Sequence, residues 1–278
     1  MNETLARKIK SASKIIVHGG RVVHFDEYTA CAIARAVGCT APIERRDPTE
    51  EELNDDTVLV MDVGGKLSHD RLDFDHHQLR RENTDSAYMV LSKALEINTT
   101  LSNVYPWFDI WSNVDCCGPF DTAEKMGYDK HVFEKINNVV SGDALELWGE
   151  NPNSPWSAEL LWKHANRIKY AICYWDEFVS KANLKRDYGI NVADLRGLDE
   201  YHPLHKAFIR NWDCNVAVYD DDRGPGLAFF RIDDDPRIDF TRCEGKDYCA
   251  FAHSLGFCLK TKNKNVDIMR IIKDALIK

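Results

Sequence analysis

Paired cysteines and long apolar runs are both missing from this sequence. The nine cysteines are an odd number, lie scattered along the chain and form no C-x-x-C pair. This pattern argues against a disulfide-stapled secreted scaffold and against a structural zinc module. It is typical of free thiols in a reducing compartment, so we expect an intracellular protein, with the cytoplasm first and the nucleus or mitochondrion as alternatives. No run approaches the ~18 apolar residues of a membrane helix, and the first residues lack the apolar stretch of a secretory signal, so no membrane partner is expected.

An excess of positive charge is also missing. The formal net charge is −9, whereas a protein that grips a long nucleic acid usually carries a basic footprint for the phosphates. A short oligonucleotide or a small phosphorylated ligand fits this charge better. What the chain does have is 278 residues with 44% apolar content, which is enough to build two domains with buried cores.

The most informative stretch covers residues 58–77, VLVMDVGGKLSHDRLDFDHH. Residues 58–61 form a continuous apolar run, which is typical of a strand covered on both faces in a parallel sheet. Asp62 follows directly, and the glycines at 64 and 65 allow a ligand to approach the backbone. The carboxyl ends of such strands border the crevice where open α/β sheets bind their ligands.

A second strand is expected over residues 71–75, and it ends in the triplet Asp75, His76 and His77. Neighbouring residues on a strand point to opposite faces, so the three side chains can share a site only if the chain turns there. We therefore predict a strand-to-loop corner beside Asp62.

The remaining elements of the first half are expected around the same sheet edge. A strand over residues 14–17 precedes His18, and if residues 22–26 are extended, His24 and Asp26 share one face. A helix over residues 27–38 would then direct its N-terminus at the site, where it favours bound phosphate. Further along we expect a strand, a helix and a segment that contains Asp115, over residues 43–47, 86–97 and 105–120.

Imidazoles and carboxylates thus gather at strand ends and in one later segment: His18, His24, Asp26, Asp62, Asp75, His76, His77 and Asp115. Taken singly, each is more often a core or surface residue with a hydrogen-bond partner, but clustered carboxylates repel each other and need cations. This donor set suits Mn²⁺, Mg²⁺ or Zn²⁺, and several carboxylates favour the harder ions. With one bridging carboxylate it could hold two ions about 3.5–4 Å apart, as in phosphoester hydrolysis.

Five motifs in order, HGGRVVHFDE, RRDP, MDVGG, FDHHQ and NVD, carry a resemblance to a known family. The chain resembles the DHH phosphoesterase superfamily, and most closely the UPF0160 branch, whose best-known members are the Myg-type 3′-5′ RNA exonucleases. The ordered motifs cover residues 15–118. The later AFAHSLGF, over residues 250–257, is similar to a His-x-x-Gly-Phe motif near the end of that family.

The resemblance implies two ions, Mn²⁺ in our prediction, with Mg²⁺ or another divalent ion as alternatives. It implies six metal ligands, of which Asp62 bridges the ions: His18, His24 and Asp62 on one ion, and Asp26, Asp62, His76 and Asp115 on the other. His77 would face the scissile phosphate, and Asp75 would orient a ligand histidine. With the bridging Asp62 these form the predicted catalytic group. The implied substrate contacts are Arg46, His253, Gly256 and Lys260.

The second half indicates a smaller α/β domain. After a break at residues 151–155, a long helix is expected over 156–186, followed by strands over 215–219 and 226–232. The predicted fold is α/β, with a parallel-sheet DHH-type domain over residues 1–135, a helical connector over 136–190 and a C-terminal substrate-binding domain over 191–278. The active site is expected in the cleft between the two domains.

The predicted function is a metal-dependent phosphodiesterase, a 3′-5′ exonuclease on RNA or short oligonucleotides. Residues 258–262, Cys-Leu-Lys-Thr-Lys, stand where relatives often carry a glycine- and histidine-rich loop. Two alternatives therefore stay open: a phosphatase for small nucleotides or polyphosphate, and a catalytically inactive metal-binding regulatory protein. A homodimer is also left open.

Overall fold

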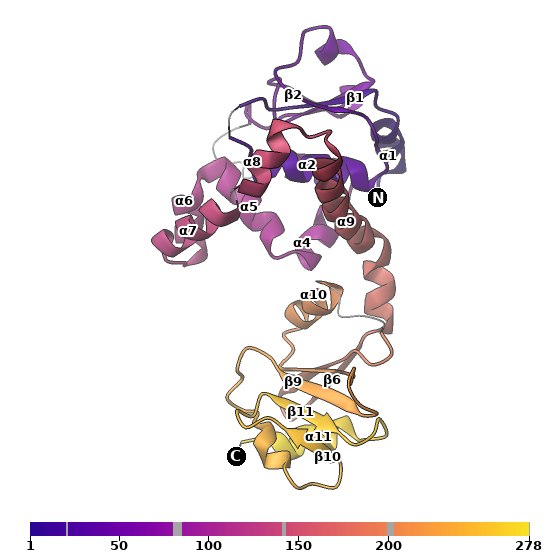
Figure 1. The fold of residues 1–278 in the computed structure, drawn as a ribbon, viewed down its shortest axis with the longest axis vertical. Helices are drawn as coiled ribbons and strands as arrows, with labels where there is room; N and C mark the ends of the chain where they lie inside the picture. Colours follow the sequence, from indigo (N-terminus) through magenta and orange to yellow (C-terminus); the bar gives the residue numbers. More distant parts are fainter. Residues whose placement is uncertain (21, 80–84, 141–142, 199–202, 278) are drawn as a thin grey trace. The chain divides into compact units, whose positions relative to one another are not determined.

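The structure is a computed structural model that describes residues 1–20, 22–79, 85–140, 143–198 and 203–277. The chain forms two compact units, Met1–Cys173 and Tyr174–Lys278, each with its own sheet (Figure 1). The predicted two-domain α/β class is therefore confirmed. The boundary falls inside one long helix, α9 (Pro155–Lys181).

The first unit is built on a five-stranded sheet of order β2-β1-β3-β5-β4. Its three central strands run parallel, and their last residues lie in register, with Val17 opposite Met61 and Met61 opposite Phe74. The apolar run of β3 is fully buried, as the sequence predicts. Since the strands end side by side, the residues that follow them meet at one edge. The five strands are β1 (Lys14–Val17), β2 (Ile43–Arg45), β3 (Val58–Met61), β4 (Leu67–Ser68) and β5 (Asp73–Phe74).

The strand expected over residues 71–75 is much shorter in the structure. A 3-10 turn, η2 (His69–Arg71), precedes it, and Leu72 adopts a left-handed backbone with φ 57°. Only β5 itself, Asp73–Phe74, is extended. The predicted corner directly after this strand, at Asp75, is present.

The largest correction concerns the start of α2 (Phe25–Ala36). The sequence prediction treats residues 22–26 as extended, but the helix begins at Phe25, and His24 is its N-cap residue. Asp26 and Glu27 therefore lie in the first helical turn, where carboxylates are favoured by the helix dipole. The shared face of His24 and Asp26, argued from the period of a strand, is wrong.

Helices make up much of the rest of this unit (Figure 1). The helix expected over residues 86–97 is α3 (Ala87–Ala94), and the segment with Asp115 is helical as α5 (Trp107–Cys117). The other helices before α9 are α1 (Glu3–Lys10), α4 (Asn98–Val104), α6 (Pro119–Met126), α7 (Lys130–Val140) and α8 (Asp143–Glu150).

The long helix α9 ends at Lys181 rather than at residue 186. The chain then forms the hairpin of β6 (Asn183–Asp187) and β7 (Ile190–Asp194). Tyr188 and Gly189 turn between these strands with φ of 54° and 72°, which is the backbone of the tight turns that hairpins favour. The helical pattern of the sequence continues past Lys181 into β6, so periodicity alone places the helix end too late.

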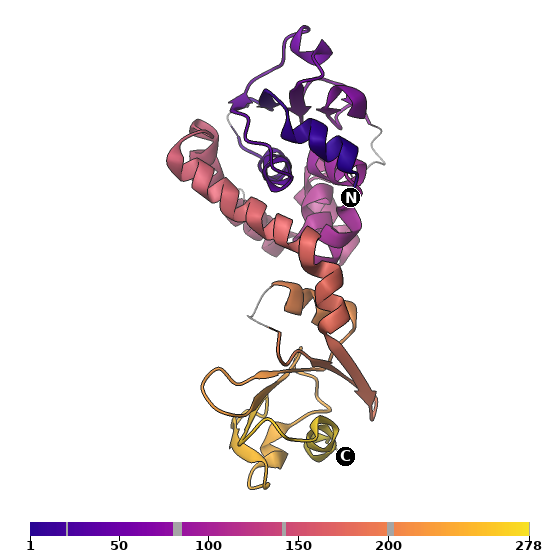
Figure 2. The same cartoon turned by 90° about the vertical axis from the view of Figure 1, so that its right-hand side faces the viewer.

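The second unit has a six-stranded sheet of order β10-β11-β9-β8-β7-β6. One sheet face packs on α11 (Ile268–Ala275) and the 3-10 turn η3 (Phe240–Cys243) in a common apolar core (Figure 2). The strands expected over 215–219 and 226–232 are β8 and β9. Its remaining elements are α10 (Pro203–Asn211), β8 (Val216–Asp220), β9 (Leu227–Arg231), β10 (Cys249–Ala252) and β11 (Cys258–Thr261). Within the described ranges, no helix has the length and apolar character to span a membrane.

Candidate metal centre

Three predicted site residues follow the ends of adjacent strands. His18 follows β1, Asp62 follows β3 and Asp75 follows β5. Asp62 is 2% exposed and has a left-handed backbone with φ 60°. Such a backbone is uncommon for any residue except glycine and is best tolerated by Asp and Asn. The chain thus leaves the sheet sharply at Asp62, and the carboxylate stays at the sheet edge.

His76 lies among three carboxylates. Its Nε2 is 3.1 Å from Asp115 Oδ2, 3.2 Å from Asp62 Oδ1 and 3.7 Å from Asp26 Oδ2. Burial opposes protonation of His76, but hydrogen bonds to Asp115 and Asp62 outweigh it and raise the pKa of the imidazole far above its ordinary value. Carboxylates from two helices and a strand end therefore converge on one position that attracts positive charge.

Asp26 is held by the start of α3. Its two carboxylate oxygens accept hydrogen bonds from the backbone N–H groups of Ala87 at 2.9 Å and Tyr88 at 2.8 Å. Burial raises the pKa of Asp26 well above its usual range, and the charges of Asp115 and Asp62 raise it further. The site therefore favours a cation beside this carboxylate.

A second group of candidate ligands contains Glu27, which the sequence analysis missed. His18, His24, Glu27 and Asp62 offer ligand atoms that all lie within 4.8 Å of one another. The Glu27 side chain is fully buried, and burial together with the Asp62 charge raises its pKa to about 8. A helix that begins at Phe25 places Glu27 three residues after His24, on the same side of the first turn. Had the sequence predicted the helix to begin at Phe25, Glu27 would have been recognised as a candidate ligand.

Three buried atoms in this group have no hydrogen-bond partner in the described part of the chain: His18 Nδ1, Glu27 Oε2 and Asp62 Oδ2. Buried polar atoms are normally paired, and leaving one unpaired is costly. A divalent cation accepts nitrogen and oxygen ligands of this kind. The residues at this position therefore fit a metal ion.

Two further groups are linked to the first, one through Asp62 and the other in turn through His76. Asp62, His76 and His77 form one, and His76, Asp115 and Cys116 form the other, each with ligand atoms within 4.8 Å. Asp62 thus belongs to two of the three groups. Cys116 was not among the predicted ligands, although it is adjacent to Asp115 in the sequence, and its Sγ lies 3.7 Å from His76 Nδ1.

Asp75 orients His77 rather than a buried ligand histidine. Asp75 Oδ1 accepts hydrogen bonds from the His77 amide at 3.1 Å and from the ring Nδ1 at 2.6 Å, while Oδ2 accepts one from the Gly65 amide. Burial acts to raise the pKa of Asp75, but these hydrogen bonds outweigh it and lower the pKa. The His77 side chain is 61% exposed, so a fixed imidazole faces outward at the edge of the metal groups.

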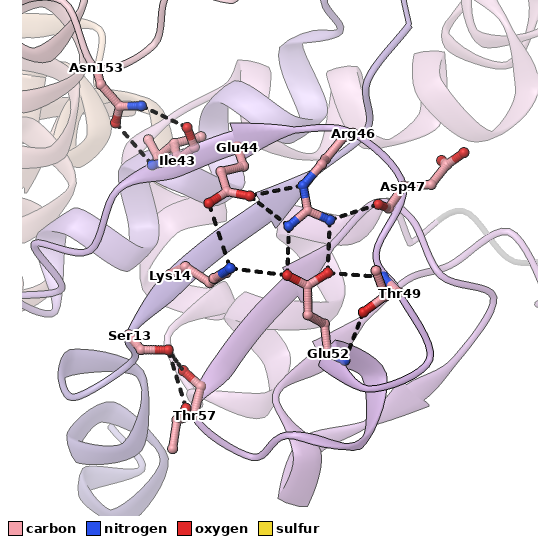
Figure 3. Close-up of polar contacts among 10 residues, drawn as sticks. All are labelled: Ser13, Lys14, Ile43, Glu44, Arg46, Asp47, Thr49, Glu52, Thr57 and Asn153. Carbon is pink, nitrogen blue, oxygen red and sulfur yellow. Dashed lines mark hydrogen bonds and ion pairs between the residues drawn. The ribbon is translucent and has the colours of Figure 1, made fainter.

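Arg46 does not contact these groups in the structure. Its guanidinium binds Glu44 Oε2 at 2.6 and 2.8 Å and both oxygens of Glu52 at 2.6 and 2.8 Å (Figure 3). Lys14 completes this network through Glu52 at 3.0 Å. The predicted contact of Arg46 with phosphate stays a prediction, and the guanidinium would have to leave two carboxylates to make it.

The neighbouring arginine, Arg45, is the one that contacts the metal groups. Its Nη2 binds Glu27 Oε1 at 3.2 Å and the carbonyl oxygens of Gly20 at 3.0 Å and Val22 at 3.3 Å. It therefore fixes both a candidate ligand and the loop between His18 and His24. The sequence gives no signal that separates the two adjacent arginines.

The loop after His18 is also closely packed. A Cβ added at Gly19 would lie 2.7 Å from Arg46 Cα, and one added at Gly20 would lie 2.6 Å from the His18 ring. The rings of His18 and His24 stack with centroids 5.6 Å apart. Glycine at these positions lets the loop approach β2 and keeps the two imidazoles together.

The remaining predicted substrate contacts lie together in the second unit, whereas every predicted metal ligand lies in the first. His253 and Gly256 are in the turn between β10 and β11, where the Gly256 amide donates to the His253 carbonyl at 2.8 Å. Lys260 on β11 pairs with Asp221 Oδ1 at 2.5 Å. Their approach to a substrate from the second domain stays a prediction.

The chain matches one family model over part of its length and is similar to a solved structure. No curated protein sequence matches the chain. Among solved structures, the chain is similar to a pGpG-specific phosphodiesterase, PggH, from Vibrio cholerae, with 12% sequence identity, coverage of 94% of this chain and 96% of that chain, and a TM-score of 0.31. The model of an uncharacterised protein family, UPF0160, labelled as the MYG1 exonuclease family, matches residues 14–100. The matched segment runs from β1 into α4 and includes every predicted metal ligand except Asp115.

Proposed function

We propose that this protein is a metal-dependent phosphodiesterase, a 3′-5′ exonuclease that acts on RNA or short oligonucleotides. The observation that carries the proposal is the buried Asp62 carboxylate, which belongs to two groups of candidate metal ligands at the carboxyl edge of a parallel sheet. The match to a family labelled as an exonuclease over residues 14–100 supports the reaction class.

The chain's residues have distinct parts in this proposal. His18, His24, Glu27 and Asp62 would hold one divalent ion, and Asp62, His76, Asp26 and Asp115 a second. Mn²⁺ fits this mixture of imidazoles and carboxylates. Such ions supply an activated water and neutralise negative charge on the phosphate.

His77 is the residue that would meet the substrate. Asp75 fixes its ring through Nδ1, so Nε2 is the atom left to contact a phosphate oxygen or to give a proton to the leaving oxygen. Arg45 keeps Glu27 and the loop before His24 in place, and its guanidinium pairs with the Glu27 carboxylate. The proposed chemistry needs no covalent intermediate.

A second candidate function is a phosphatase for small nucleotides. Lys260, which was predicted to contact the substrate phosphate, is already paired with Asp221. The net charge of −9 does not favour binding of a long RNA. Both observations favour a small substrate. A binding protein without turnover would keep the same metal ligands.

The test uses a short RNA labelled at its 5′ end, incubated with Mn²⁺ and the wild-type protein, Asp62→Asn or Asp70→Asn. Asparagine keeps the shape of Asp62 and tolerates its left-handed backbone, while Asp70 is a fully exposed control for the same exchange. We expect stepwise shortening from the 3′ end. The rate should fall at least ~100-fold for Asp62→Asn, since partners that only orient a ligand already cost ~10–100-fold, and Asp70→Asn should resemble the wild type.

Other outcomes decide between the alternatives. Release of inorganic phosphate from nucleotides without shortening of the RNA would establish the phosphatase. Bound Mn²⁺ without hydrolysis of RNA, nucleotides or a phosphodiester dye would overturn the enzyme proposal and leave the metal-binding regulatory protein.

A further inference from the structure

A cavity of about 640 Å³ adjoins the metal groups within the first unit. His24 and Asp115, which belong to the metal groups, form part of its wall, and so does Asp26, whose Oδ2 lies 3.7 Å from His76 Nε2. This volume lies within the range of pockets that bind small molecules. A substrate whose phosphate meets the metal groups would therefore have space beside that phosphate.

Part of the wall is apolar and aromatic. Phe25 and Trp111 lie with their ring centroids 6.3 Å apart, and Val114 and Val140 also line the cavity. These side chains belong to an apolar cluster with Phe133 and Ala123, and Trp111 is 9% exposed. The rings are thus held by packing and can offer a firm surface to a flat apolar group.

The polar groups of this wall are amides and one carboxylate. Asn137 and Asn138, both on α7, line the cavity together with Glu146 on α8. Among the described residues, no lysine or arginine lines it. With the carboxylates of Asp26 and Asp115 at one end, such a cavity repels phosphate and admits a neutral group with hydrogen-bonding edges.

We propose that this cavity holds the base of the nucleotide that the enzyme releases, with Asn137 and Asn138 contacting the edge of the base. A nucleobase has apolar faces for the aromatic wall and polar edges for amides, and asparagine pairs well with such edges. The inference rests on the proposed function, because that function places the phosphate of the released nucleotide at the metal groups.

The test compares two ligands that differ only in the base. Adenosine 5′-monophosphate and ribose 5-phosphate are titrated into the full-length protein at a fixed Mn²⁺ concentration. Isothermal titration calorimetry measures the Kd of each ligand. For the wild type we expect the adenosine monophosphate to bind at least about tenfold more tightly, because one stacked and hydrogen-bonded base contributes at least that factor.

The variants Asn137→Leu and Asn138→Leu should each reduce this ratio about fivefold or more and leave the Kd of ribose 5-phosphate unchanged. Asn151→Leu is the matched control, since Asn151 is exposed and does not line the cavity. Thermal unfolding checks each variant, and Asn→Asp at the same position replaces any leucine variant that is destabilised.

A wild-type ratio near one, or a ratio that both cavity variants leave intact, would overturn the inference. If the protein hydrolyses RNA but the two Kd values are nearly equal, the base pocket is overturned and the proposed exonuclease stands. If adenosine monophosphate binds more tightly, the variants abolish that preference and no phosphodiester is hydrolysed, the proposed exonuclease is overturned. A pocket for nucleoside monophosphates would remain.

Discussion

His164 shows how burial changes the behaviour of a single residue. His164 lies in the long helix that the sequence predicts over residues 156–186. In the structure its ring stacks on Tyr28 at 5.4 Å and lies 5.6 Å from Trp107. Its Nε2 is buried and has no hydrogen-bond partner among the described residues. Burial, together with the charge of Arg167, lowers the pKa of His164 to about 4.

This residue should make the folded protein sensitive to acid. Below pH 6.5 an unfolded chain protonates His164, whereas the folded protein resists protonation until about pH 4. Stability from this residue is therefore complete above pH 6.5 and is lost as the pH falls to about 4, by about 3 kcal/mol in total and ~2 kcal/mol at pH 5. Urea unfolding at pH 7 and pH 5 measures the change.

The variant His164→Leu should lose less stability than the wild type between these two pH values, by about 2 kcal/mol. His131→Leu, at an exposed position on α7, is the control and should keep the wild-type difference. An equal loss of stability in His164→Leu and the wild type would show that the buried imidazole is not responsible.

At the scale of residues, the sequence predicted which side chains form the site better than it predicted the contacts between them. His18, Asp62 and Asp75 could be placed because each follows a strand of the sheet. Glu27 and Arg45 could not, since their positions depend on where α2 begins and on how β2 faces the loop after His18. Spacing along the chain carries no information about such contacts between elements.

At the scale of elements, a charged network joins three segments that are distant in the sequence. Arg46 follows β2, Glu52 begins the turn η1 (Glu52–Asn54) and Lys14 begins β1. Figure 3 shows Glu52 between the two cations. Hydrogen bonds from Arg46 and from the Thr49 amide hold the pKa of Glu52 far below its ordinary value. The acidic segment between β2 and β3, residues 46–57, is thereby attached to the sheet.

Removing this carboxylate should loosen the segment. We expect Glu52→Ala to lower the free energy of unfolding by about 1 kcal/mol, as for well-formed but partly exposed ion pairs. High salt should narrow the difference, and Glu50→Ala, at an exposed position, should have no comparable effect. A Glu52→Ala protein as stable as the wild type would mean that the network contributes nothing measurable.

Element boundaries were the weakest part of the prediction. The buried run of β3 could be assigned because four consecutive apolar residues suit a strand covered on both faces and are too few for a core helix. The start of α2 was placed two residues late because His24 and Asp26 also fit the period of a strand. The end of α9 was placed late because helical periodicity continues into β6, where pairing with β7 decides the backbone.

At the scale of the whole molecule, every candidate metal ligand that the structure groups lies in the unit Met1–Cys173. A ligand that binds the folded state stabilises it by about 2.7 kcal/mol at a hundredfold excess over Kd. We expect Mn²⁺ to slow hydrogen exchange at the ends of β1 and β3 and in α5, and chelation to reverse the effect. The unit Tyr174–Lys278 should change little.

Mass spectrometry of exchanged peptides measures this pattern, with Asp62→Asn as the variant that should lose the protection. Protection by Mn²⁺ concentrated in the second unit, for example at its acidic turn after β8, would contradict the assignment of the metal ligands to the first.

The packing of Gly19 against the backbone of Arg46 has a consequence for how this sequence can change over generations. A new side chain at position 19 has no room unless β2 moves, and a shift of β2 displaces Arg45 and, through it, the loop that carries His24. Substitutions in the loop and in β2 should therefore be coupled in evolution. A larger residue at position 19 could be fixed only in a protein whose β2 had already changed to make room for it.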